Sequence, residues 1–200
     1  KTVLSGLGHK LVEVDFSELT SGICSYYVIA PAECSSNLSR FDGVKYGYRS
    51  KGAKDIANLY MNTRSDGFGD EVKKRILIGT HVLSAGFYDA YYLQAQKVRR
   101  MIKLKFENFF KDVDLIFMPT TLDQAFEKNR KSDDPNRMYK EDLLTIPANL
   151  AGLPAISFPN GFKNNLPIAG QLIGKYFGED LLLNTTNKIQ EVTDWHKMTP

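Results

Sequence analysis

The 200-residue sequence contains none of the short motifs that mark a self-sufficient enzyme. It has no Gly-x-Ser-x-Gly segment, which an α/β hydrolase needs to place its serine on a sharp turn between strand and helix. It has no His-Glu-x-x-His or Cys-x-x-Cys pair, and the histidines His9, His81 and His196 lack the spacing of metal ligands. We therefore predict no metal site and no unaided catalysis by this chain.

Phosphate loops and disulfide frameworks are missing as well. The glycine pair at residues 67 and 69 is followed by Asp70 and Glu71, whose negative charges would repel a phosphate. The two cysteines, Cys24 and Cys34, are too few to form a disulfide framework for a domain of this size. This composition favours reduced, cytosol-like surroundings.

No apolar run approaches the roughly 20 residues that span a bilayer, so we expect no membrane association. The sequence begins without methionine. Residues 1–16 predict the end of a helix, stopped near residues 6–8, and then an alternating strand over residues 10–16. A chain that opens inside a helix is expected to be a fragment.

What is present indicates an ordinary globular protein. The content is 42% hydrophobic and 24% charged, and the formal net charge of +3 is too small to imply nucleic-acid binding by itself. Helix and strand patterns alternate along the sequence, which shows no internal repeat and no domain linker. We predict a single α/β unit over residues 1–200, with a mixed β-sheet flanked by helices.

The strongest helical pattern covers residues 88–111, where apolar side chains recur every three or four positions. Further helices are predicted at residues 31–38, at 70–79 with Asp70 as the N-cap, at 143–150 and at 180–192. Residues 58–69 are polar and rich in turn formers, which predicts a connection rather than a helix.

Short apolar runs at residues 115–119 and 155–158 predict buried strands. Turn signals follow residues 155–158 and precede a further strand over residues 168–174. We therefore expect strands 155–158 and 168–174 to pair antiparallel. The polar residues 124–140 predict a surface loop. If the sheet continues into further sequence, residues 115–119 or 155–158 lie beside an unpaired edge, and the isolated chain should self-associate.

Three segments carry a family resemblance: YYVIAPAECSSNLSRFDG from residue 26, GDEVKKRILIGTHVLSAGFYDAYYLQAQKVRR from residue 69, and DLLTIPANLAGLPAISFPNGF from residue 142. Together they resemble the C-terminal part of the amidase signature family. Within that family they are most similar to the glutaminase subunits of glutamyl-tRNA(Gln) amidotransferases. The resemblance implies the C-terminal part of an amidase-signature fold.

In this family a serine nucleophile, a second serine on a cis peptide and a lysine lie upstream, in a signature of the form Gly-Gly-Ser-Ser-Gly-Gly-Ser. None of that signature is present, so we assign no catalytic residue to this chain. Ser35 and Ser36 lack the flanking glycines, and we interpret them as part of a polar turn or helix face.

The residues that the resemblance does assign concern glutamine. A free amino acid offers a carboxylate and an ammonium on one carbon, which a guanidinium and a carboxylate recognise together. By position, Arg75 corresponds to the residue that binds the glutamine carboxylate, Asp142 to the residue that binds the amino group, and Tyr26 to a tyrosine lining the pocket. The residues alone favour simpler roles: Arg75 as a solvated helix residue and Asp142 as the N-cap of residues 143–150.

The resemblance implies that the complete subunit hydrolyses glutamine and passes ammonia to a partner that converts Glu-tRNA(Gln) to Gln-tRNA(Gln). It also implies that this partner uses ATP and Mg²⁺, that a small third subunit braces the pair, and that tRNA is met indirectly through the complex. This chain itself would bind no cofactor. We expect a cytoplasmic protein, or alternatively one of the mitochondrial or plastid matrix.

Two other functions stay open at this point. One is the C-terminal portion of a general amidase, which would not need the amino-acid clamp. The other is a stand-alone binding or assembly module that contacts tRNA through a basic run in the long helix, although a solvated outer face explains that run more simply. The run consists of Lys97, Arg99, Arg100, Lys103 and Lys105.

Overall fold

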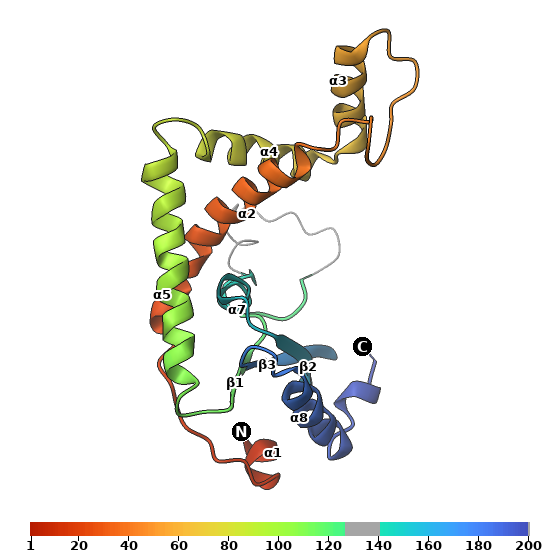
Figure 1. Cartoon of the computed structure of the whole chain (residues 1–200). Helices are drawn as coiled ribbons and strands as arrows, with labels where there is room; N and C mark the ends of the chain where they lie inside the picture. Colours follow the sequence, from red (N-terminus) through yellow and green to blue (C-terminus); the bar gives the residue numbers. More distant parts are fainter. Residues whose placement is uncertain (127–140, 200) are drawn as a thin grey trace. The chain divides into compact units, whose positions relative to one another are not determined.

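The structure is a computed structural model that describes residues 1–126 and 141–199. The chain divides into two compact units, which we treat separately. Residues 1–23 and 98–200 form what we call the sheet unit, and residues 24–97 form the helical unit. The boundaries between them fall inside two helices, α2 (Gly22–Leu38) and α5 (Leu93–Phe109) (Figure 1).

The sheet unit is built on three strands, β1 (Leu115–Pro119), β2 (Ala155–Lys163) and β3 (Leu166–Gly174). Their order is β1-β3-β2, and both pairings are antiparallel. The predicted hairpin is therefore confirmed, as is the α/β class. Its turn contains Asn164 and Asn165 at φ of 52° and 60°, a backbone shape that asparagine tolerates well.

Helices cover the two faces of this sheet differently. Leu172 of β3 and Phe158 of β2 pack with Leu182 and Ile189 of α8 (Glu179–Glu191). Alternate residues of a strand face opposite sides, so Gln171 and Ile173 point the other way. That second side belongs to α7 (Ile146–Ala151), which Figure 1 shows across the sheet from α8. The short elements of this unit are α1 (Thr2–Gly6), η1 (Ser17–Ser21) and η3 (Trp195–Lys197).

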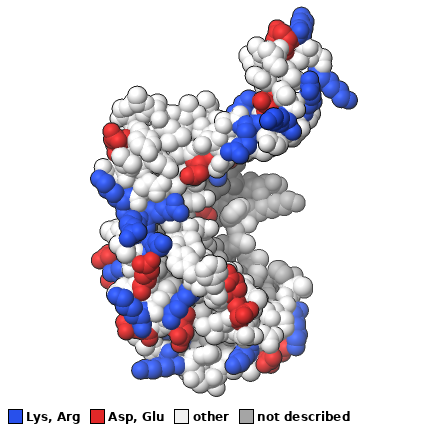
Figure 2. All heavy atoms as spheres, viewed as in Figure 1, with Lys and Arg blue, Asp and Glu red and all other residues white. Residues whose placement is uncertain are grey.

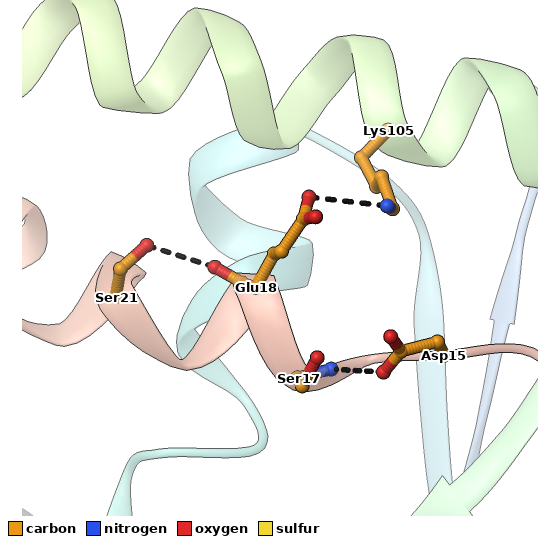
Figure 3. Close-up of polar contacts among 5 residues, drawn as sticks. All are labelled: Asp15, Ser17, Glu18, Ser21 and Lys105. Carbon is orange, nitrogen blue, oxygen red and sulfur yellow. Dashed lines mark hydrogen bonds and ion pairs between the residues drawn. The ribbon is translucent and has the colours of Figure 1, made fainter.

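Polar contacts fix the single turn η1 against α5. The Ser17 amide donates to Asp15 Oδ1 at 2.9 Å, and the Ser21 hydroxyl donates to the Glu18 carbonyl at 2.8 Å. The Glu18 carboxylate accepts from Lys105 Nζ at 3.1 Å (Figure 3). These contacts follow the segment 10–16, for which the sequence predicted a strand. That prediction is wrong, because residues 10–16 have no strand partner and no regular structure.

The helical unit contains α3 (Ile56–Gly67), α4 (Asp70–Val82) and the single π-turn η2 (Tyr88–Tyr92), which leads into α5. The predicted polar connection over residues 58–69 is wrong, since most of it is helix α3. Asp55 caps this helix by accepting a hydrogen bond from the Asn58 amide at 2.7 Å. Only Leu59 and Thr63 of α3 are buried, so its apolar periodicity is too weak to register in the sequence.

Other helix boundaries differ from the prediction in small ways. Helix α2 starts at Gly22 rather than residue 31, with Pro31 inside it. The N-cap of α4 is Gly69 rather than Asp70, which lies in the first turn, where its charge favours the helix dipole. The predicted loop at residues 124–140 lies mostly outside the described residues. Among the described helices, none is long and apolar enough to cross a membrane.

The tightest packing in the helical unit is the contact between α2 and α4. A Cβ atom added at Gly79 would lie 1.9 Å from the Pro31 carbonyl oxygen and 2.8 Å from Ser35 Cβ. Only glycine allows the two backbones to approach this closely. Beside the contact, the Ser35 and Thr80 hydroxyls share a hydrogen bond of 2.9 Å.

We predict that Gly79→Ala destabilises the protein by about 3 kcal/mol, because a backbone carbonyl must move to admit the methyl group. The free energy of unfolding, measured by urea denaturation, tests this. Gly6→Ala is the matched control, since no atom lies within 4 Å of a Cβ at that helical position and φ is not positive there. Equal effects of the two substitutions would contradict the close contact.

Candidate functional site

Arg75 and Tyr26, two of the three residues proposed for the site, come together in the helical unit. Arg75 lies on α4, and its Nε donates to Glu71 Oε1 one turn earlier at 3.1 Å. Tyr26 lies on α2, where its ring packs edge-on against Tyr27 with centroids 5.2 Å apart. Both tyrosines lie close enough to Arg75 to contribute to its pKa. The close contact between α4 and α2 at Gly79 fixes the position of Arg75 relative to Tyr26.

Electrostatics keep the Arg75 side chain charged and oriented. The hydrogen bond that Arg75 donates to Glu71 raises the pKa of Arg75 above its ordinary value. Partial burial opposes this rise, whereas the Glu71 charge and the two tyrosines add to it. The side chain is 41% exposed. Within residues 1–126 and 141–199, no hydrogen bond or ion pair occupies its two terminal nitrogens. They form a planar fork that suits a carboxylate ligand.

Asp142 belongs to the sheet unit, in the turn that leads into α7. Its main-chain oxygen accepts hydrogen bonds from the Ile146 amide at 3.0 Å and from the Thr145 amide at 3.2 Å. Thr145, not Asp142, is the N-cap of α7, and it makes no side-chain cap. The simpler interpretation of Asp142 as a helix N-cap is therefore wrong.

A buried glutamine fixes the segment that carries Asp142. Gln171 of β3 is 3% exposed, and its Nε2 donates to the Leu144 carbonyl at 2.9 Å and to the Pro119 carbonyl at 3.2 Å. It thereby ties the end of β1 to the turn before α7. Beside it lies a cavity of about 310 Å³. The polar side chains that line the cavity are those of Thr120, Thr145, Asn149, Ser157 and Gln171.

This cavity has the size of a small-molecule site, and its lining combines polar and apolar side chains without a charged group. The Thr120 and Ser157 hydroxyls share a hydrogen bond of 2.9 Å, and Asn149 Nδ2 donates to the Thr145 carbonyl at 2.9 Å. Such a lining offers hydroxyls and amides to a neutral polar group. In the part of the chain that the structure describes, no three His, Cys, Asp or Glu residues converge on a possible metal site.

The sequence interpretation named Tyr26, Arg75 and Asp142 but missed the residues that hold them. Glu71, which orients Arg75, stands four positions before it on the same helix, a spacing that indicates a pair. Gln171 is the one polar side chain in the apolar run IAGQLIG, and a lone amide in a buried strand needs internal partners. Both signals were present in the sequence.

The basic run in the long helix is partly used for internal contacts. In the sheet unit, Arg99 Nε donates to the Leu150 carbonyl at 3.0 Å, and Lys105 pairs with Glu18 at 3.1 Å. Lys103 lies 3.9 Å from Glu107 on the same helix. Arg99 and Lys105 thus support α7 and η1, and Lys103 pairs within α5, so three of the five cations of the run make internal contacts.

Comparison with known proteins identifies the family of this chain. Residues 1–183 match the sequence profile of the Amidase family. The chain is 56% identical over 198 residues to the A-subunit of glutamyl-tRNA(Gln) amidotransferase from Hahella chejuensis, and 54% identical over 200 residues to that from Coxiella burnetii. These alignments cover 99% and 100% of this chain but 41% of each relative. The chain thus spans about two fifths of the length of these relatives.

Solved structures give the same result for the fold. The crystal structure of the glutamyl-tRNA(Gln) amidotransferase A-subunit from Thermotoga maritima superposes with a TM-score of 0.63 at 40% identity. That superposition covers 90% of this chain and 34% of the other. The structure of 6-aminohexanoate cyclic dimer hydrolase reaches a TM-score of 0.69 at 20% identity, over 100% of this chain and 41% of the other, and this likeness concerns the fold alone.

We predict that Gln171→Leu lowers the free energy of unfolding by about 2 kcal/mol, since two buried carbonyls lose their donor. Urea denaturation measures the effect. Gln94→Leu makes the same chemical change at an exposed helix position and should stay within about 0.5 kcal/mol of the unaltered protein. A Gln171 variant as stable as the Gln94 variant would show that the bridge between β1 and the turn before α7 is dispensable.

Proposed function

This chain belongs to the Amidase family, and we propose that it forms the glutamine-binding and scaffold portion of the glutaminase subunit of a glutamyl-tRNA(Gln) amidotransferase. The observation that carries the proposal is the Arg75 fork, oriented by Glu71 on α4 near Tyr26, with both terminal nitrogens unpartnered among residues 1–126 and 141–199. A general amidase would have no need of a charged fork beside its substrate, whereas a free amino acid requires one.

In this proposal the substrate is held by its amino-acid head. The α-carboxylate of glutamine accepts two parallel hydrogen bonds from the terminal nitrogens of Arg75. The α-ammonium donates to the Asp142 carboxylate, and Tyr26 packs against the aliphatic part. With the head held, the side-chain amide is presented in one orientation.

The reaction itself is proposed to use a serine in the part of the relatives that this chain does not cover. The serine oxygen attacks the amide carbonyl, the C–N bond breaks, and ammonia leaves as the acyl-enzyme forms. Water then hydrolyses the ester and releases glutamate. The residues described above contribute by positioning the amide, which can supply several kcal/mol of the barrier reduction.

The partners follow from the same proposal. Ammonia would pass to a partner subunit that converts Glu-tRNA(Gln) to Gln-tRNA(Gln) with ATP and Mg²⁺, and a third subunit would brace the complex. This chain would act on tRNA as part of that assembly and would hold no cofactor of its own. The cytoplasm is the proposed location, with an organellar matrix as the alternative.

We predict that Arg75→Ala in the full-length subunit raises the KM for glutamine about 10- to 100-fold, because a charge-assisted pair with the substrate carboxylate is lost. Glutaminase assays without tRNA measure it. Lys74→Ala is the control, since this neighbouring lysine is exposed on the same helix and should leave KM unchanged.

Nearly intact glutaminase activity after Arg75→Ala would favour a general amidase over the proposed subunit. A fall in kcat with no change in KM would also contradict the clamp, because it would place Arg75 in the chemical step rather than in binding.

A further inference from the structure

A loop of the helical unit carries four cations that form no ion pair with any residue that the structure describes. This loop, residues 44–54, which we call the basic loop, joins the end of α2 to α3 and exposes Lys45, Arg49, Lys51 and Lys54. Among the described residues, no carboxylate lies within 4.0 Å of any of the four. Figure 2 shows Lys and Arg side chains gathered over this part of the helical unit.

The two carboxylates that flank the loop are already engaged by the backbone. Asp42 Oδ1 accepts from the Val44 amide at 2.8 Å, and Asp55 Oδ1 accepts from the Asn58 amide at 2.7 Å. Residues 42–55 carry four cations and two carboxylates, a formal net charge of +2. Both carboxylates thus bind main-chain amides, and among the described residues neither forms an ion pair with the lysines or with Arg49.

Two tyrosines of the loop present flat apolar surface among these charges. Tyr46 is 52% exposed and Tyr48 is 55% exposed. Each ring is supported from one side: Tyr46 by Phe41, with centroids 6.1 Å apart, and Tyr48 by Gly67, where a Cβ would lie 3.2 Å from the ring. Supported rings that remain half exposed are suited to stacking against another flat group.

The loop is held in place by side chains of α3. Thr63 Oγ1 accepts from the Ser50 amide at 3.1 Å, and both residues are buried. Arg64 Nη1 donates to the Leu38 carbonyl at 2.8 Å and to the Phe41 carbonyl at 3.1 Å, which fixes the start of the connection. A cavity of about 670 Å³, lined by residues 49–56 and Leu59, lies alongside. Hydrogen bonds to α3 thus fix the loop, and its cations and tyrosine rings lie exposed beside the cavity.

We propose that the basic loop binds a single-stranded segment of RNA, with Tyr46 and Tyr48 stacked on bases and the four cations on phosphates. Alternating cations and supported rings match this ligand, because phosphates need charge and unpaired bases need flat partners. The inference deepens the proposed function, since the relatives are named for a tRNA-dependent reaction.

The test measures binding of a fluorescein-labelled, mixed-sequence 15-nucleotide RNA and of labelled unacylated tRNA to the full-length subunit, by anisotropy over a range of KCl concentrations. Lys51→Ala/Lys54→Ala should weaken binding at low salt about tenfold and reduce the slope of log K against log[KCl] by about 1.4. Tyr46→Ala/Tyr48→Ala should weaken binding at least tenfold and leave that slope unchanged.

Lys10→Ala/Lys163→Ala is the matched control, because it removes the same charge from two exposed lysines of the sheet unit. Equal effects of the two lysine pairs would overturn the proposal by showing that only total charge matters. So would loop variants that lower the melting temperature of the subunit yet keep RNA affinity, which would indicate that protein covers the loop.

Glutaminase activity of the unaltered subunit, measured without RNA, tests the proposed function separately. If glutamine is hydrolysed but the loop variants bind RNA like the control, this inference fails alone. If the loop binds RNA as predicted but glutamine is not a substrate, the proposed function fails and the RNA site stands.

Discussion

The proposed clamp depends first on the close approach of α2 and α4. The Pro31 carbonyl and the backbone at Gly79 leave no room for a side chain, since a Cβ would lie 1.9 Å from the oxygen. This contact sets the two helices at a fixed spacing, and about one turn away along each helix lie Tyr26 and Arg75. Without it, the tyrosines of α2 would not reach the guanidinium on α4, and Glu71 alone would orient Arg75.

In the sheet unit, a buried side chain rather than a backbone contact positions the proposed ligand residue. A buried amide, Gln171, connects the end of β1 to the turn that carries Asp142. Buried polar groups of this kind specify one geometry, because an alternative arrangement would leave carbonyls without donors. The two units therefore position their proposed ligand residues by backbone contact in one case and by a side-chain bridge in the other.

The parts of the fold that were predictable are those where burial repeats along the sequence. The long amphipathic helix and the hairpin of β2 and β3 have strong apolar patterns and clear turn signals, and both were found. Helix α3 was missed because only Leu59 and Thr63 are buried, so capping by Asp55 was its main signal. The strand expected over residues 10–16 had the right alternation but found no partner strand, which sequence alone does not reveal.

For the proposed site too, some features could be predicted from the sequence and others could not. Residue type and family resemblance pointed to Tyr26, Arg75 and Asp142, but the supports at Glu71, Gly79 and Gln171 depend on contacts between elements. Gly79 in particular looks like an ordinary weak point of a helix until the backbone of α2 is placed against it. The candidate residues could be named from the sequence, whereas the contacts that position them could be seen only in the fold.

The central claim is that Arg75 and Asp142 hold opposite ends of the same amino-acid head. The most direct measurement is inhibition of glutaminase activity, in the full-length subunit, by two glutamine analogues. Glutaramate keeps the carboxylate but lacks the α-ammonium, and 4-aminobutanamide keeps the ammonium but lacks the carboxylate.

Arg75→Ala should weaken inhibition by glutaramate and leave 4-aminobutanamide unchanged, whereas Asp142→Asn should do the reverse. Each loss should be about tenfold or more, as expected for a charge-assisted hydrogen bond. If both variants weakened both analogues equally, or neither analogue were affected, the two residues would not form an amino-acid clamp.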